Sequence, residues 1–181
     1  MLHQVQSLLE ELSGGAEAVF VGGFSMGGAQ ALNLLRRPLP ASLRGIFSIG
    51  SFLTADSALL NRDLATAATG PPVLMMHGHD DQLVSAALGR TTASSLLLGG
   101  VDVQFREYAG LAHEVGEEQL ADLLCWMDDA IHRQSGESKA GLVGCDRTVG
   151  RVPSEDSFPF LIESDLGNAK VRVRFMVPAG A

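Results

Sequence analysis

Ser25 is the residue whose setting most strongly suggests chemistry, because it stands in the pattern Gly23-x-Ser25-x-Gly27 between an apolar run and a helix-forming segment. A serine at the tip of a sharp strand-to-helix turn needs small neighbours, since a side chain at either glycine would collide across the bend. The hydroxyl then stands at a helix N-terminus, where the helix dipole and the amide of Met26 favour a developing negative charge. The pattern predicts a nucleophilic serine. Because the chain has 21 glycines, a purely structural turn is the alternative.

A partner set for this serine follows later in the chain. A serine hydroxyl is a weak nucleophile, so Ser25 needs a histidine base and a carboxylate that orients the imidazole. Asp80 and Asp81 follow the apolar run 73–76, and His113 lies in a Gly-x-x-His loop after the next run. Serine, aspartate and histidine in this order match the chain order of α/β-hydrolases. The simpler alternatives are a loop histidine facing solvent and an aspartate that caps the following helix.

The run His77-x-His79-x-Asp81 also resembles a metal-ligand pattern. Gln82 occupies the place of a further ligand and no second histidine cluster follows, so we expect no metal and no cofactor. His77 is expected to pack at the end of a strand. Cys125 is expected to be a core residue rather than a nucleophile.

Strand-like and helix-like segments alternate around these residues. Apolar runs at 18–21, 45–50 and 73–76 are continuous, which is typical of parallel strands buried on both faces, and 101–106 alternates as an edge strand does. Helical spacing is found at 5–12, 26–37, 85–98 and 120–131. This alternation predicts an α/β fold with a parallel sheet and flanking helices, in which the strand ends gather the three catalytic candidates at one edge.

The composition changes after residue 134. The segment 134–141 has the polar, glycine- and serine-containing composition of a linker, and two β-like runs, 158–162 and 171–176, follow it around 165–168. We therefore expect an α/β domain at 1–134 and, at 135–181, a linker and tail in which we find no chemistry.

Composition excludes several partners. A net charge of -8 without a basic stripe argues against nucleic acid. The N-terminal segment lacks the pattern of a signal or transit peptide, and no apolar run approaches the roughly 20 residues of a membrane span. Two cysteines, Cys125 and Cys145, make no disulfide framework, so we expect free thiols and a cytoplasmic protein.

Four motifs together resemble the acyl-protein thioesterase and lysophospholipase-like family of α/β-hydrolases over about 19–131. They are Gly-Phe-Ser-Met-Gly-Gly at 23–28, Ser-Phe-Leu at 51–53, His-Gly-x-x-Asp-x-Leu-Val at 77–84, and Tyr-x-x-x-x-His-Glu at 108–114. Met26 and the Ser-Phe-Leu segment are most similar to the lysophospholipase-like protein 1 branch. The resemblance implies a serine hydrolase that cleaves esters or thioesters through an acyl-enzyme, with Ser25, His113 and Asp81 as the triad; Asp80 is the fallback acid.

The same resemblance implies a substrate that is a small acyl ester or an S-acylated protein. Residues flanking the three loops are expected to form an acyl pocket, or else ordinary core; they are Phe52, Leu53, Leu83 and Leu111. Met26 supplies one oxyanion donor. The family's first strands and the turn with a second donor would precede residue 1, a loss worth about 2.7 to 4 kcal/mol of transition-state stabilisation. The alternative function is therefore a catalytically impaired binding or dimerisation module, with a homodimer through the exposed sheet edge as one form.

Overall fold

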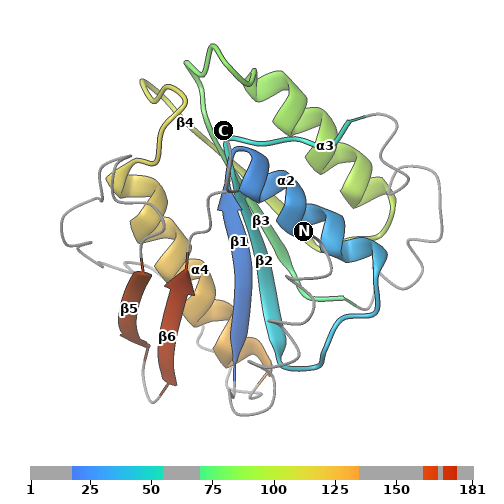
Figure 1. Ribbon diagram of the computed structural model, residues 1–181, viewed down its shortest axis with the longest axis vertical. Helices are drawn as coiled ribbons and strands as arrows, with labels where there is room; N and C mark the ends of the chain where they lie inside the picture. The colour runs from blue at the N-terminus through green and yellow to red at the C-terminus, as the bar shows by residue number, and fades with distance from the viewer. Residues whose placement is uncertain (1–17, 55–69, 135–160, 167–168, 175–181) are drawn as a thin grey trace.

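Four parallel strands form the sheet that carries the candidate residues (Figure 1). The computed structural model describes residues 18–54, 70–134, 161–166 and 169–174. The strands of the sheet, in spatial as well as chain order, are β1 (Val19–Phe24), β2 (Leu43–Ile49), β3 (Val73–Gly78) and β4 (Val103–Tyr108). The expected helix at 5–12 lies outside the described residues.

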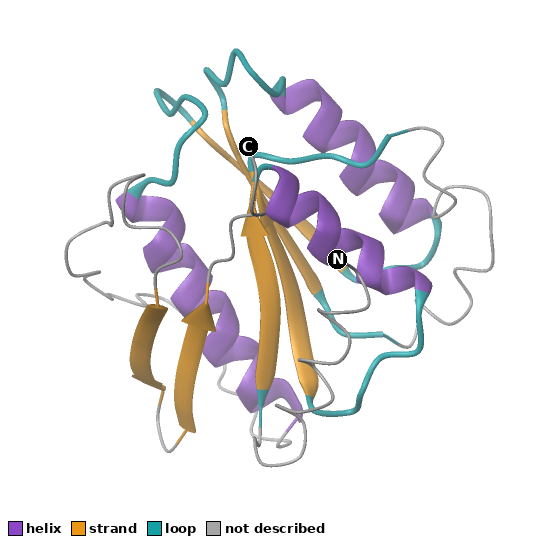
Figure 2. Ribbon diagram, in the orientation of Figure 1, coloured by secondary structure: helices purple, strands orange, loops and turns teal. Residues whose placement is uncertain are grey.

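Helices cover both faces of this sheet (Figure 2). The helices are α2 (Met26–Asn33), which continues as the 3₁₀ turn η1 (Leu34–Arg36), α3 (Ala86–Leu98) and α4 (Glu117–Gln134). Buried side chains of α2 and α3 share one core cluster, and those of α4 belong to a second cluster on the opposite face. The prediction of an α/β fold with a parallel sheet and flanking helices is confirmed.

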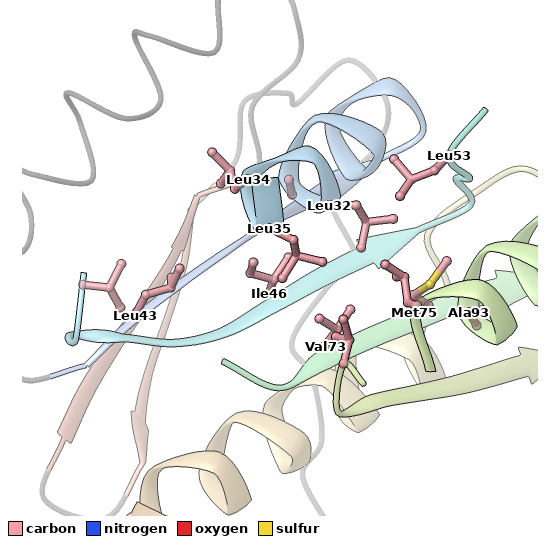
Figure 3. Packing of buried hydrophobic residues seen from close by; sticks show 13 residues of the cluster. Leu32, Leu34, Leu35, Leu43, Ile46, Leu53, Val73, Met75 and Ala93 are labelled. Atoms are coloured by element: carbon pink, nitrogen blue, oxygen red, sulfur yellow. The ribbon is translucent and has the colours of Figure 1, made fainter. Parts of the chain in front are cut away.

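The two central strands are buried along almost their whole length, as their continuous apolar sequences predict. On the α2 side, Leu32 packs with Ile46 and Met75 in a cluster of aliphatic side chains (Figure 3). On the α4 side, the indole of Trp126 lies against Gly45, where a Cβ would come within 2.4 Å of the ring. The sheet is therefore packed on both faces, and this packing supports the loops at the carboxyl ends of its strands.

Several element boundaries differ from the sequence expectation, and two of the differences concern β1 and α2, on either side of Ser25. β1 extends to Phe24, three residues beyond the predicted end, because Gly22, Gly23 and Phe24 pair with Phe47–Ile49 of β2. The predicted helix 26–37 is instead α-helical only to Asn33 and tightens into η1 before Pro38. A 3₁₀ turn is a common way to end a helix before a proline.

A separate two-stranded antiparallel sheet comes from the C-terminal segment. Its strands are β5 (Leu161–Leu166) and β6 (Ala169–Arg174), and β6 lies beside β1 without joining the four-stranded sheet (Figure 1). The expected runs 158–162 and 171–176 identified this hairpin but displaced both strands, because Asp165 and Leu166 belong to β5 rather than to the turn.

The expectation of free thiols is wrong for Cys125, which is disulfide-bonded on α4. Cys125 is only partly buried, so the expectation of a core residue is not met. Cys145 lies outside the described residues. The inference of a reducing compartment rested on free thiols and loses that support. None of the described helices has the length and apolar character needed to cross a membrane.

Candidate active site

Ser25 occupies a strained turn between β1 and α2. It has φ 52° and ψ -121°, and it is the one non-glycine residue with positive φ within the described ranges. Such a conformation costs an L-residue of order 1–3 kcal/mol and is found where surrounding structure enforces it. Here a Cβ on Gly23 would come within 2.7 Å of the Gly27 backbone, and one on Gly28 within 2.8 Å of the Gly23 carbonyl oxygen. The close backbone approach explains why this turn needs its glycines.

The backbone around Ser25 separates two roles. The Ser25 amide donates to the Ile49 carbonyl oxygen at 2.8 Å and so ties the turn to β2. Met26 begins α2, and the first amides of a helix have no partner within the helix. The Met26 amide therefore stays a predicted oxyanion donor.

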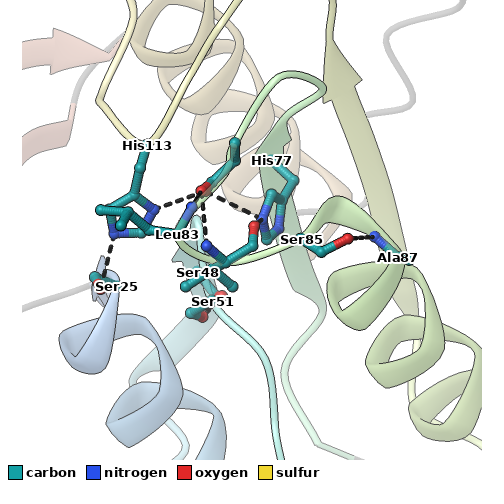
Figure 4. A network of polar contacts seen from close by, with 10 residues as sticks. Ser25, Ser48, Ser51, His77, Leu83, Ser85, Ala87 and His113 are labelled. Carbon is teal, nitrogen blue, oxygen red and sulfur yellow. Dashed lines mark hydrogen bonds and ion pairs between the residues drawn. The ribbon is translucent and has the colours of Figure 1, made fainter.

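The imidazole of His113 bridges Ser25 and Asp81 (Figure 4). Its Nε2 lies 3.0 Å from Ser25 Oγ, and its Nδ1 lies 2.6 Å from Asp81 Oδ2. The ring of Phe24 lies against that imidazole, with centroids 4.6 Å apart, and Gly50 borders both rings. Residues 25, 81 and 113, which are far apart in the chain, thus meet in the order serine, histidine, aspartate.

Asp81 is buried and its carboxylate is fully engaged. Oδ1 accepts the amides of Leu83 at 3.0 Å and Val84 at 2.8 Å, while Oδ2 accepts the His113 Nδ1–H. Burial raises the pKa of the Asp81 carboxyl, but the hydrogen bonds from His113 and from the two amides outweigh burial and hold that pKa below its usual value. The carboxylate form is therefore the stable one at neutral pH.

The contacts of Asp80 and Ser85 bear on two alternatives, Asp80 as the acid and an aspartate as the cap of α3. Asp80 is exposed, and its amide donates to the Leu111 carbonyl oxygen, so Asp81 rather than Asp80 faces His113. Helix α3 is capped by Ser85, whose Oγ accepts from the Ala87 amide at 3.3 Å. The alternative role of the aspartates as caps of this helix is therefore not seen.

The residues of the His77-x-His79-x-Asp81 run do not gather as metal ligands would. His77 is buried in β3, whereas His79 is exposed and pairs with Glu107 at 2.5 Å. Within the described ranges, no three histidine, cysteine, aspartate or glutamate side chains are grouped so that they could hold a metal ion.

The predicted pocket residues divide into two kinds. Leu83 is 80% exposed beside the site, and Phe52 and Leu111 are half-buried. Leu53, by contrast, is buried in the α2-side core, and its amide donates to Thr92 Oγ1 at 3.0 Å. Leu53 is therefore a core residue, and its assignment to the pocket is corrected.

Sequence reasoning missed a polar pair beneath the elbow. Ser48 Oγ and Ser51 Oγ are 2.5 Å apart and buried, and a Cβ on Gly28 would come within 2.6 Å of Ser51 Oγ (Figure 4). The signal was a serine within the otherwise apolar run 45–50, followed by a second serine three residues later. The pair packs α2 closely onto the end of β2.

The sequence matches the model of the Phospholipase/Carboxylesterase family over residues 3–131. The chain belongs to this family. It is 32% identical over 120 residues to mouse lysophospholipase-like protein 1, covering 66% of this chain and 48% of that protein. It is 32% identical over 108 residues to acyl-protein thioesterase 1 of Gibberella zeae, covering 59% of this chain and 46% of that one.

Solved structures agree with the family. The crystal structure of Arabidopsis thaliana SOBER1 superposes with a TM-score of 0.57 at 25% identity, covering 72% of this chain and 62% of that one. The chain spans about half the length of the two curated relatives, 48% and 46%. The family resemblance inferred from the four motifs is confirmed.

Proposed function

We propose that the chain is a serine hydrolase that cleaves carboxylic esters or thioesters, with Ser25 as nucleophile, His113 as base and Asp81 as the orienting carboxylate. The observation that carries the proposal is the unbroken contact from Ser25 Oγ through His113 to Asp81, at 3.0 and 2.6 Å. Membership of the Phospholipase/Carboxylesterase family supports the same chemistry.

The proposed reaction includes a proton path that these two distances support. Asp81 accepts the His113 Nδ1–H, which leaves Nε2 free to take the Ser25 proton as the hydroxyl attacks an acyl carbonyl. The protonated imidazole then gives this proton to the leaving alcohol or thiol, and the acyl group stays on Ser25. Water enters by the reverse sequence, losing a proton to His113 and releasing the acid. The Met26 amide at the start of α2 faces the developing oxyanion.

The surroundings support an acyl substrate. Met26 is 55% exposed at the start of α2, and Leu83 is exposed on the loop that carries Asp81. Phe52 and Leu111 are partly buried, on the segments after β2 and β4, and in this proposal they add apolar contact for an acyl chain. An S-acylated protein is the second substrate class, since one relative is named acyl-protein thioesterase 1.

The second candidate function is a catalytically impaired binding module. It is favoured if the Met26 amide acts without a second donor, because the Ser25 amide donates to the Ile49 carbonyl oxygen and cannot replace one. Loss of one of two donors costs about 2.7 to 4 kcal/mol, or a factor of about 100 to 1,000 in rate. Such a protein would still acylate slowly.

One experiment tests both candidates. The purified chain is incubated with a fluorophosphonate probe, the labelled residue is identified by mass spectrometry, and hydrolysis of a short-chain aryl ester and of an acyl thioester is measured. Labelling at Ser25 with turnover of either substrate, both lost in Ser25→Ala, supports the hydrolase. Labelling without turnover supports the impaired module. A cooperatively unfolding protein that is not labelled at Ser25 contradicts the hydrolase.

A further inference from the structure

His77 is a buried histidine that the proposed reaction does not use. Its side chain is 1% exposed, on β3, four residues before Asp81. A polar ring in such a position needs a partner, because an unsatisfied buried donor costs about 1–3 kcal/mol. The contacts of this ring therefore indicate why a histidine, rather than an apolar side chain, stands at the end of the strand.

The ring is directed at the loop that carries the proposed acid. Its Nε2 lies 2.7 Å from the Val84 carbonyl oxygen and 3.4 Å from Asp81 Oδ2 (Figure 4). A carbonyl oxygen can only accept, so Nε2 carries the hydrogen and donates it to Val84. The same nitrogen lies close to the Asp81 oxygen that accepts the His113 Nδ1–H.

The two contacts close a small ring of interactions around one residue. The Val84 amide donates to Asp81 Oδ1 while the Val84 carbonyl accepts from His77. Val84 is therefore held on both sides of its backbone, and the carboxylate is oriented by contacts to both of its oxygens. Loss of the His77 contact would release Val84 and with it one of the two amides that fix Oδ1.

Packing keeps the imidazole in this orientation. Helix α3 approaches so closely at Gly89 that a Cβ there would lie 2.6 Å from His77 Nδ1, and the ring of Phe105 lies on the neighbouring strand with centroids 6.4 Å apart. A ring confined in this way cannot turn its donor elsewhere.

We propose that His77 is a positioning residue, which orients the Asp81 carboxylate toward His113 through its contacts with Val84 and Asp81. The inference rests on the proposed function, because orientation of Asp81 matters only if His113 serves as a base.

The test uses the full chain with three substitutions. His77→Leu removes the donor, and His77→Gln keeps an N–H near the position of Nε2. His79→Gln is the matched control, since His79 is exposed and pairs with Glu107 away from the triad. For each variant the maximal rate of fluorophosphonate labelling and the probe concentration at half-maximal rate are measured. The far-downfield proton resonance of the His113 Nδ1–H is recorded as a readout that needs no turnover.

In His77→Leu the maximal labelling rate should fall about tenfold, the equivalent of one ordinary hydrogen bond, with less than a twofold change in half-saturation. The downfield resonance should shift or broaden. His77→Gln should restore both within about threefold, and His79→Gln should match the wild type.

A wild-type rate and an unchanged resonance in folded His77→Leu would overturn the inference. So would a folded His77→Gln that is as slow as His77→Leu, because a ring-shaped filler would then be what matters. If His77→Leu does not fold, His77→Gln decides: a labelling rate within about threefold of the wild type and a wild-type resonance support the inference, and a slow rate with a shifted resonance overturns it. If the wild type is not labelled at all, the proposed function fails, while the resonance still reports whether His77 orients Asp81.

Discussion

Asp81→Asn is the substitution that probes the proposed site most directly. It replaces one carboxylate oxygen by an NH₂ group and leaves the shape almost unchanged. Two backbone amides, from Leu83 and Val84, donate to Oδ1, so the amide oxygen of the asparagine must take that position. The NH₂ group then faces His113 Nδ1, 2.6 Å away from Oδ2 in the wild type.

This orientation of the asparagine amide reverses the tautomer of the His113 imidazole. Facing a donor, His113 Nδ1 must accept, so the proton moves to Nε2 and points at Ser25 Oγ. An imidazole in this tautomer cannot take the hydroxyl proton. In serine proteases the same change lowers kcat about 10⁴-fold, which corresponds to about 5 kcal/mol. We expect a loss of this order in Asp81→Asn, with the free energy of unfolding at neutral pH lowered by no more than about 3 kcal/mol.

The assay compares the rates of Ser25 labelling and of aryl-ester hydrolysis in Asp81→Asn and Asp80→Asn. Asp80→Asn is a matched control, since it makes the same charge change one residue away on an exposed side chain. It should remain within twofold of the wild type. A folded Asp81→Asn that retains more than a tenth of the wild-type rate would refute the role of Asp81, and a larger loss in Asp80→Asn would transfer that role to Asp80.

Three further predictions concern stability. Because the folded protein holds the pKa of Asp81 below its usual value, the stabilisation from this carboxylate is complete above about pH 4 and disappears as the pH falls further; between pH 5 and pH 3 the urea midpoint should therefore decrease more in the wild type than in Asp81→Asn, and equal decreases would contradict the lowered pKa. Gly28→Ala should destabilise the protein by about 1–3 kcal/mol in urea unfolding and slow Ser25 labelling, since the new Cβ meets Ser51 Oγ and the Gly23 carbonyl oxygen; an unchanged midpoint would show that α2 can shift. Leu32→Ala, at a position 0% exposed, should cost about 2–5 kcal/mol, whereas Leu98→Ala, at 90% exposure, should change stability by less than about 0.5 kcal/mol; similar losses in the two would contradict the assigned core.

Local sequence carried the prediction of the elbow and of the strand–helix order. Glycines on both sides of Ser25 mark a bend too tight for a Cβ, and the structure shows this collision distance at Gly23. Continuous apolar runs marked the central strands because both of their faces are covered by helices. These features can be predicted from the sequence because each depends on residues within a few positions of one another.

Contacts across the chain were beyond such signals. Composition gave no reason to pair Cys125, which is disulfide-bonded in the fold. Leu53 and Phe52 are apolar neighbours in the sequence, yet Leu53 is buried in the core whereas Phe52 is half-buried. The sequence predicted only that His77 packs at the end of a strand, and its contacts with Val84 and Asp81 are what indicate a positioning role.

What the sequence by itself determined is the set of chemical groups and their chain order: a serine in a glycine turn, two adjacent aspartates, then a histidine. Tertiary structure decided that Asp81 and not Asp80 meets His113, because the turn after β3 directs one side chain inward to two backbone amides and leaves the other in solvent. The two adjacent side chains differ in burial, and the inward position is favourable because His113, which is distant in the chain, supplies a donor there.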